Sequence, residues 1–254
     1  MSSLAKQISF IITFFFVIAT PSFGQVAEHF YNDPTNLHAD PNYTPGDFSL
    51  SDQNDARTYY QVKKEELVME EDALKLGELF STGLGEIRFT TIKNESAQVL
   101  GYFRHYFAVA SLSEVGIQSL KILIDVNSLD TAVPGRNNRI LEIFFESMKP
   151  ELGTVIIELT EFDMTQAQWN QLQSGEEVSL QTSGNIFLNN VSKNIAIPLS
   201  FKKQNQTWLI KTQEPFELLI SDFDFGDRIY ELMKECNHES MGNKVKVESK
   251  IYLR

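Results

Sequence analysis

Cys236 and His238 are the residues whose types could most directly do chemistry, since a thiolate and an imidazole can bind a metal ion or form a nucleophilic pair. A structural zinc site needs about four ligands and a catalytic site about three. The neighbouring sequence offers Glu239 but no second cysteine and no paired histidine motif. We therefore predict a free thiol on a loop, no catalytic residues and no metal site. A metal-dependent enzyme using Cys236 and His238 is the alternative.

Three closely spaced aspartates, Asp222, Asp224 and Asp227, offer carboxylate oxygens of the kind that bind Ca²⁺. The calcium-loop signature that ends in a bidentate glutamate is absent from this stretch. The spacing therefore favours a solvated turn over a calcium site.

Ser128, Asp130 and Thr131 form a third polar group, with Arg136 shortly after it. No histidine or lysine stands beside these residues in an arrangement for nucleophilic work. Hydroxyl and carboxylate oxygens at such positions accept hydrogen bonds from backbone N–H groups at turns and helix starts. We expect Arg136 to anchor the same loop by a fork of hydrogen bonds, with contact to a ligand as the alternative.

From Gly83 onward the apolar residues recur at every second position, which is the period of a strand with one buried face. Asn189 and Asn190 separate two of these stretches and tolerate the positive φ of a tight hairpin turn. Many short strands of this kind predict an all-β fold. We expect a closed antiparallel barrel of about eight strands, because closure removes the sheet edges that template aggregation.

One helix is expected beside the barrel, at residues 136–148. Its apolar residues fall on one face at three- and four-residue spacing, namely Ile140, Leu141, Phe144, Phe145 and Met148. Pro150 is expected to stop it.

The N-terminal part of the chain has a different character. Residues 1–24 resemble a secretory signal, with Lys6 before an apolar run that is too short to span a membrane. Residues 25–57 are rich in turn-forming residues and predict an irregular arm. We expect the barrel domain to occupy residues 58–254, beginning with a strand at 59–62 and then a helical segment. An acidic helix is the alternative for this stretch, because apolar residues such as Leu67, Leu74 and Leu79 could form its buried face. The protein is then expected to be periplasmic or secreted, without a stable membrane anchor after signal cleavage, and an uncleaved hydrophobic anchor is the alternative.

The composition excludes some partners. The formal net charge is −12 and no block of Lys or Arg offsets it, so nucleic acid is not expected to bind. The single cysteine cannot form a disulfide within one chain, so stability must come from an apolar core. Nothing in the sequence indicates the oligomeric state.

Four segments, in order, resemble the YceI-like, polyisoprenoid-binding family. They are the strand Val99-Leu-Gly-Tyr-Phe103, the stretch Ser128 to Phe145 (Ser, Asp130-Thr131, Arg136, then Phe144-Phe145), the hairpin Gly184 to Lys193, and the turn Ser221-Asp-Phe-Asp-Phe-Gly226. Four departures are visible: Asn137 stands where the family usually has Asp, the helix is about one residue shorter, Phe187 replaces a common Thr, and Asn190 stands where the family has the hairpin Gly. Asn190 still suits the turn, because Asn tolerates positive φ.

The resemblance implies a lipocalin-like barrel that carries or senses an apolar isoprenoid or quinone-like lipid, with no cofactor other than such a bound lipid. The apolar faces of the strands and helix predict a ligand-binding lining of Phe89, Phe103, Ile122, Ile124, Phe144, Val155, Ile157, Leu180, Ile197, Leu199, Phe201 and Leu218. The same alternation would equally make a dry core.

Two further possibilities stay open. The aromatic stretch 102–107, which contains Arg104 and His105, could meet a lipid head group at the mouth of the barrel. A cell-envelope interaction module without a ligand is the alternative to the carrier.

Overall fold

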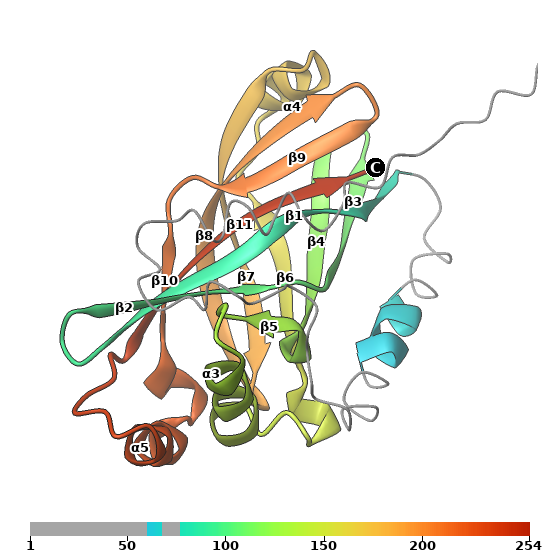
Figure 1. The fold of residues 1–254 in the computed structure, drawn as a ribbon. Coiled ribbons are helices and arrows are strands. Elements are labelled where there is room, and N and C mark those ends of the chain that lie inside the picture. Colours follow the sequence, from blue (N-terminus) through green and yellow to red (C-terminus); the bar gives the residue numbers. More distant parts are fainter. Residues whose placement is uncertain (1–59, 68–76) are drawn as a thin grey trace, which may run out of the picture.

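A closed antiparallel barrel makes up most of the structure, a computed structural model that describes residues 60–67 and 77–254 (Figure 1). The strands are β1 (Glu78–Lys93), β2 (Ala97–Phe103), β3 (Tyr106–Ser113), β4 (Gly116–Asp125), β5 (Leu129–Asp130), β6 (Thr154–Phe162), β7 (Glu177–Leu188), β8 (Val191–Gln204), β9 (Thr207–Thr212), β10 (Phe216–Leu219) and β11 (Lys244–Leu253). The ring runs β1-β11-β9-β8-β7-β6-β4-β3 and closes where β3 pairs with β1. Three strands lie outside the ring: β2 pairs with β1, β5 pairs with β2, and β10 pairs with β11. The predicted all-β barrel is confirmed.

Strand β1 closes the ring by changing partners along its length. Its first residues pair with β3, at Phe80 opposite Val109, and its later residues pair with β2. Gly85 lies at the irregularity between these halves with φ of +113°. A Cβ there would lie 2.1 Å from the carbonyl oxygen of Lys250, so glycine lets β1 pass close to β11.

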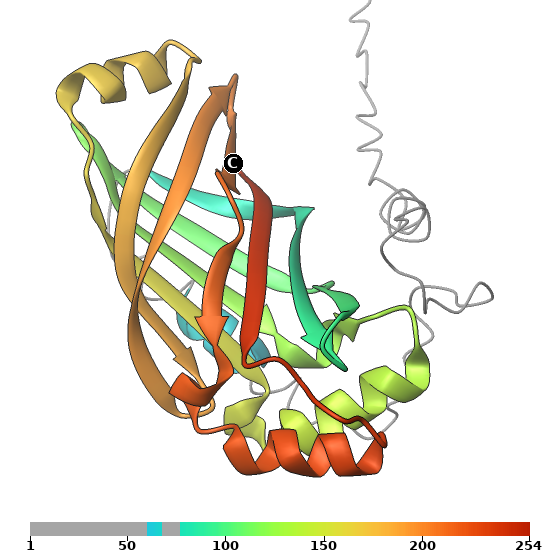
Figure 2. The ribbon, with the colours of Figure 1, turned by 90° about the vertical axis from the view of Figure 1, so that its left-hand side faces the viewer.

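Alternation along the strands sends apolar side chains into the barrel, as in β7, where every second residue from Val178 to Ile186 is buried. Figures 1 and 2 show helix α4 (Gln166–Gln173) at one end of the barrel and helices α3 (Pro134–Arg139) and α5 (Gly226–Glu235) at the other. We call these the α4 end and the α5 end. At the α4 end Trp169 packs on Trp208, with ring centroids 6.0 Å apart, so side chains fill the barrel there.

The expected helix at 136–148 is present but is shorter and irregular. An α-helix, α3 (Pro134–Arg139), continues into a π-helical turn, η2 (Ile140–Phe144). The wide turn and the positive φ of Glu146 end the helix early. Met148 is 52% exposed and does not share the buried face predicted for it.

Two further helices were not expected from the sequence: α4 and α5 (Gly226–Glu235). Three short 3₁₀ turns complete the described elements: η1 (Val126–Ser128), η3 (Pro150–Leu152) and η4 (Ile220–Phe223).

Residues 60–67 form a helix, so the strand expected at the start of this segment is wrong within the described residues. Tyr60 and Leu67 are buried against Phe107, Val109 and Leu123, so tertiary packing decides this segment. The expected signal segment 1–24 and arm 25–57 lie outside the described residues. In the described ranges, no helix combines the length and apolar character needed to cross a bilayer.

Gly184 provides a test of the barrel packing. A Cβ at this buried position in β7 would lie 1.9 Å from the carbonyl oxygen of Glu158 in β6, so the two strands would have to separate. We expect Gly184→Ala to lower the free energy of unfolding by about 1–3 kcal/mol in urea denaturation.

The matched control is Gly135→Ala in α3, where no atom lies within 4 Å of the new Cβ. This variant should keep or slightly raise stability, because Ala is the better helix former. Equal stability losses in the two variants would contradict the close packing of β6 and β7.

Candidate functional site

The α5 end of the barrel contains a cavity of about 140 Å³. Its lining comes from the barrel strands and from the helices and turns that close this end, namely Ile87, Phe89, Thr91, Phe103, Ile124, Ile140, Phe144, Phe145, Val155, Ile157, Ile186, Leu188, Leu218, Ile220, Phe223, Phe225, Leu232, Met241, Val245 and Val247. Thr91 is the one residue of this lining with a polar side chain, and its hydroxyl donates a hydrogen bond to the carbonyl oxygen of Lys244 at 3.2 Å. The cavity is therefore suited to an apolar guest.

The predicted lining residues divide between the two ends of the barrel. Seven of them surround the cavity: Phe89, Phe103, Ile124, Phe144, Val155, Ile157 and Leu218. The other five are buried in the packed core and do not line the cavity: Ile122, Leu180, Ile197, Leu199 and Phe201. Phe201, for example, packs edge-on against Phe162 at 6.2 Å between ring centroids. Ligand binding by either group stays a prediction.

Aromatic rings form one wall of the cavity. Phe144 of η2 stacks on Phe225 with ring centroids 4.1 Å apart, and Phe145 meets both rings edge-on. Phe223 and Phe225 come from the turn with the three aspartates, whose side chains are exposed as predicted. We did not predict these two rings as lining, although their alternation with the aspartates was a usable signal.

Helix α5 closes the floor of the cavity through Leu232. Arg228 fixes this helix in place: its guanidinium pairs with Glu146, donates to Oδ1 of Asn189 at 2.7 Å and lies 5.5 Å from the centre of the Phe225 ring. Asn189 also donates to the carbonyl oxygen of Phe223 at 2.6 Å. The hairpin turn predicted at Asn189 and Asn190 therefore has a second role, since it ties η4 and α5 to the barrel.

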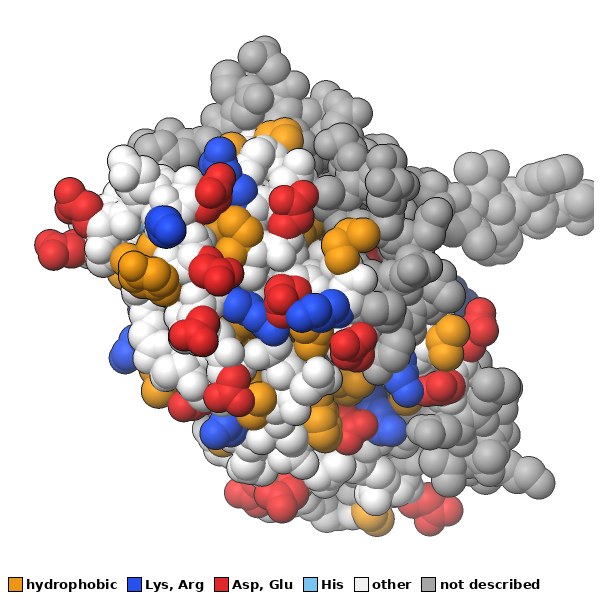
Figure 3. All heavy atoms as spheres, turned by 90° about the horizontal axis from the view of Figure 1, so that it is seen from below, with side chains coloured by type: hydrophobic (Ala, Val, Ile, Leu, Met, Phe, Trp, Pro, Cys, Tyr) orange, Lys and Arg blue, Asp and Glu red, His pale blue; other side chains and the backbone are white. Residues whose placement is uncertain are grey.

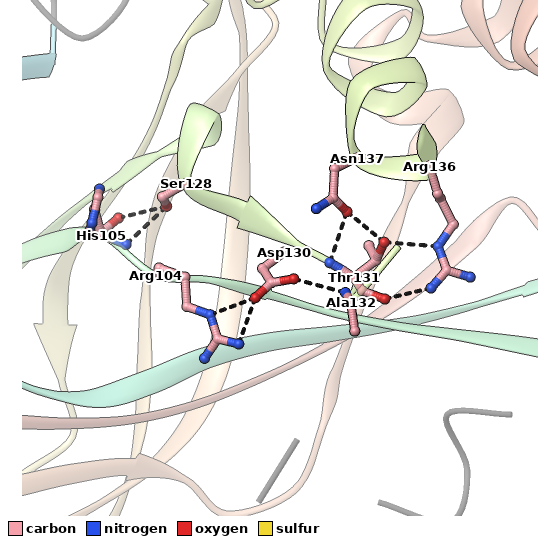
Figure 4. A network of polar contacts seen from close by, with 8 residues as sticks. All are labelled: Arg104, His105, Ser128, Asp130, Thr131, Ala132, Arg136 and Asn137. Carbon is pink, nitrogen blue, oxygen red and sulfur yellow. Dashed lines mark hydrogen bonds and ion pairs between the residues drawn. The ribbon is translucent and has the colours of Figure 1, made fainter. Parts of the chain in front are cut away.

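A polar network positions α3 and η2 beside the cavity (Figure 4). Ser128 accepts the backbone N–H of His105 at 2.9 Å and donates to the carbonyl oxygen of Asp125 at 2.6 Å. Asp130 accepts from Arg104 at 2.7 and 3.0 Å and from the N–H of Ala132 at 2.8 Å. These contacts agree with the structural roles predicted for Ser128 and Asp130.

Arg136 makes the predicted fork of hydrogen bonds within the same network. Its Nε donates to the hydroxyl of Thr131 at 2.8 Å and its Nη2 to the carbonyl oxygen of Thr131 at 2.6 Å. Asn137 accepts the N–H of Thr131 at 2.9 Å, so this residue fills the position of the family's Asp with an equivalent acceptor. Burial lowers the pKa of Arg136 to about 10, although the charge of Asp130 opposes that shift.

Cys236 and His238 lie in a positively charged setting. Burial lowers the pKa of His238, and the charges of Lys93, Arg139 and Arg136 lower it further. Such neighbours repel a metal cation. Within residues 60–67 and 77–254, no three His, Cys, Asp or Glu side chains gather as metal ligands.

The aromatic stretch with Arg104 and His105 lies outside the cavity lining, apart from Phe103. Arg104 faces Asp130, and His105 Nδ1 lies 3.5 Å from Asp125. A role of Arg104 and His105 in contacting a lipid head group stays a prediction.

Asp130 tests how far the polar network supports the site. Its side chain is fully buried against Arg104, and loss of one partner from a buried ion pair costs about 3–5 kcal/mol. We expect Asp130→Asn to lower the free energy of unfolding by about that amount.

Glu248→Gln serves as the control, because the Glu248–Arg88 pair is about one-third exposed and such pairs contribute about 0–1 kcal/mol. Urea denaturation of both variants makes the comparison. If Asp130→Asn lowered the free energy of unfolding by no more than Glu248→Gln does, the polar network would not be what holds this loop.

Comparisons with known proteins agree with the fold. A family model described as a YceI-like domain matches residues 81–253. A domain from Saccharophagus degradans, described as polyisoprenoid binding and implicated in plant cell wall breakdown, superposes with a TM-score of 0.62 at 18% identity, over 71% of this chain and 99% of that one.

BcnA from Burkholderia cenocepacia superposes with a TM-score of 0.52 at 11% identity, over 66% of this chain and 95% of that one. No curated protein matches the chain. The two structural likenesses show a shared fold, and the family model covers more than half of the sequence. The chain therefore belongs to the YceI-like family, as the four sequence segments indicated.

Proposed function

We propose that the protein binds an apolar isoprenoid or quinone-like molecule in the cavity at the α5 end and carries or senses it without catalysing a reaction. The observation that carries the proposal is the cavity lining, which is apolar except for Thr91. Transfer of apolar surface from water into such a site is favourable by about 25 cal/mol per Å².

The size of the cavity bears on what it can hold. A volume of about 140 Å³ is comparable to that of an engineered apolar cavity of ~150 Å³ in another protein, which stays dry and accepts benzene. The cavity thus suits a short stretch of an isoprenoid chain. A longer chain would have to displace side chains or extend outward past the partly exposed Phe103, Ile140 and Met241.

The isoprenoid class of the ligand is supported by the family and by the description of the Saccharophagus degradans domain as polyisoprenoid binding. A binding role is favoured over catalysis because the one polar group of the lining, the Thr91 hydroxyl, donates to a backbone carbonyl. A periplasmic or secreted location is part of the proposal and rests on the signal-like residues 1–24.

Val155→Trp tests binding in the cavity. Val155 lines the cavity from β6, and the larger indole would occupy the space proposed for the ligand. We expect Val155→Trp to weaken binding of citronellol, a ten-carbon isoprenoid alcohol, by about ten-fold or more, which is about 1.4 kcal/mol, in isothermal titration calorimetry.

Val115→Trp is the matched control, since Val115 is 60% exposed and does not line the cavity. It should bind citronellol as the unchanged protein does. Circular dichroism spectra that match that of the unchanged protein would show that both variants fold. The proposed function would be overturned if the unchanged protein did not bind citronellol, or if Val155→Trp bound it as tightly as the unchanged protein does.

A further inference from the structure

Four side chains that can carry positive charge come together from three separate segments. Lys93 lies at the end of β1, Arg136 and Arg139 lie in α3, and His238 follows α5. We call these four residues the basic cluster. A β-bridge joins Lys93 to the segment that follows α5, and α5 contacts η2, which continues α3, so the three segments meet in a chain whose net charge is −12. The lowered pKa of His238, to which Lys93, Arg136 and Arg139 contribute, agrees with this placement.

The backbone places the basic cluster beside the cavity. Lys93 is two residues beyond Thr91 on the same strand, so the two side chains share a face of β1. Lys93 also forms a β-bridge with Met241, three residues after His238. Arg136 precedes Ile140 by one helical turn. Thr91, Met241 and Ile140 all line the cavity, so each of the three segments links a basic residue to the cavity wall.

The positive charges of the basic cluster are only partly compensated. The charges that lower the pKa of His238 are all positive, whereas Arg136 is acted on by Asp130, which is already paired with Arg104, and Lys93 is acted on by Cys236. Arg136 bonds only neutral acceptors, both on Thr131, and forms no ion pair within the part of the chain that the structure describes. A guanidinium has five N–H donors, so Arg136 retains donors for a further oxygen ligand.

We propose that the basic cluster binds the anionic head group, a phosphate or a carboxylate, of an amphiphile whose apolar chain enters the cavity. This inference rests on the proposed function and adds the charge of the ligand to it. Arg and Lys bind both kinds of oxyanion through charge-assisted hydrogen bonds. A head group beside Thr91, Met241 and Ile140 would sit at the edge of the apolar lining, as an amphiphile requires.

A flat membrane surface fits the observations less well than a single head group. Seen from below, the end of the molecule carries acidic and basic side chains side by side with scattered hydrophobic ones (Figure 3). That visible face is neither broadly basic nor broadly apolar, so it lacks the features that attract an interfacial protein to anionic lipid.

Three probes with the same ten-carbon chain isolate the head group: citronellol, citronellic acid and citronellyl phosphate. We expect the unchanged protein to bind at least one of the two anionic probes about ten-fold or more tightly than citronellol in titration calorimetry. The tighter of the two identifies the source as carboxylate or phosphate. Added salt should lower the affinity of the protein for the anionic probes and leave its affinity for citronellol unchanged.

The combined variant Lys93→Gln and Arg139→Gln tests the residues while sparing Arg136, which holds Thr131. It should lose about ten-fold or more in affinity for the anionic probe and bind citronellol within about two-fold of the unchanged protein. The control is Lys202→Gln with Lys250→Gln, on β8 and β11, which removes the same charge away from the cavity lining. It should change neither affinity.

The possible failures are distinguishable. Citronellol binding without a preference for either anionic probe, or a preference that survives Lys93→Gln with Arg139→Gln, would overturn this inference and leave the proposed function standing. Anionic binding that Val155→Trp leaves unchanged would also overturn it, because the head group would then bind without its chain in the cavity. Failure of citronellol and of both anionic probes to bind would overturn the proposed function and the inference together.

Discussion

Closure of the sheet is the constraint on which the rest of the structure depends. Eight strands in a ring leave an interior that side chains or a guest must occupy. At the α4 end Trp169 and Trp208 fill it. At the α5 end helices and turns close the barrel, and side chains of η2, η4 and α5 line the cavity together with those of the strands. The cavity is the space that remains between them.

The elements that close the α5 end are held by polar contacts, and this explains why polar residues matter to an apolar site. Asp130 and Thr131 fix the loop that precedes α3, whereas Arg228 and Asn189 fix α5 and η4. Each of these contacts satisfies buried or half-buried polar groups that would otherwise be costly to remove from water. Aromatic residues attached to the same loops then supply the wall of the cavity.

Local signals in the sequence predicted the barrel, the hairpin at Asn189 and Asn190, and the hydrogen-bonding roles of Ser128, Asp130 and Arg136. Such features depend on two-residue periodicity or on side chains that bond nearby backbone. The sequence could not show which of the predicted lining residues face the cavity and which lie in the packed core. Ile157 at the cavity and Ile197 in the packed core show the same two-residue alternation. Helix α5 was missed for a similar reason, since its role depends on contacts with η2 that are distant in sequence. The basic cluster likewise joins residues far apart in the chain.

The most direct measurement of the central claim is the molecule that the protein carries when it is purified without added ligand. Native mass spectrometry gives the mass of the complex, and organic extraction followed by mass spectrometry identifies the guest. The account predicts one apolar isoprenoid molecule per chain, with an anionic head group. A protein that emerges empty and takes up no isoprenoid on incubation would contradict a binding role for the cavity.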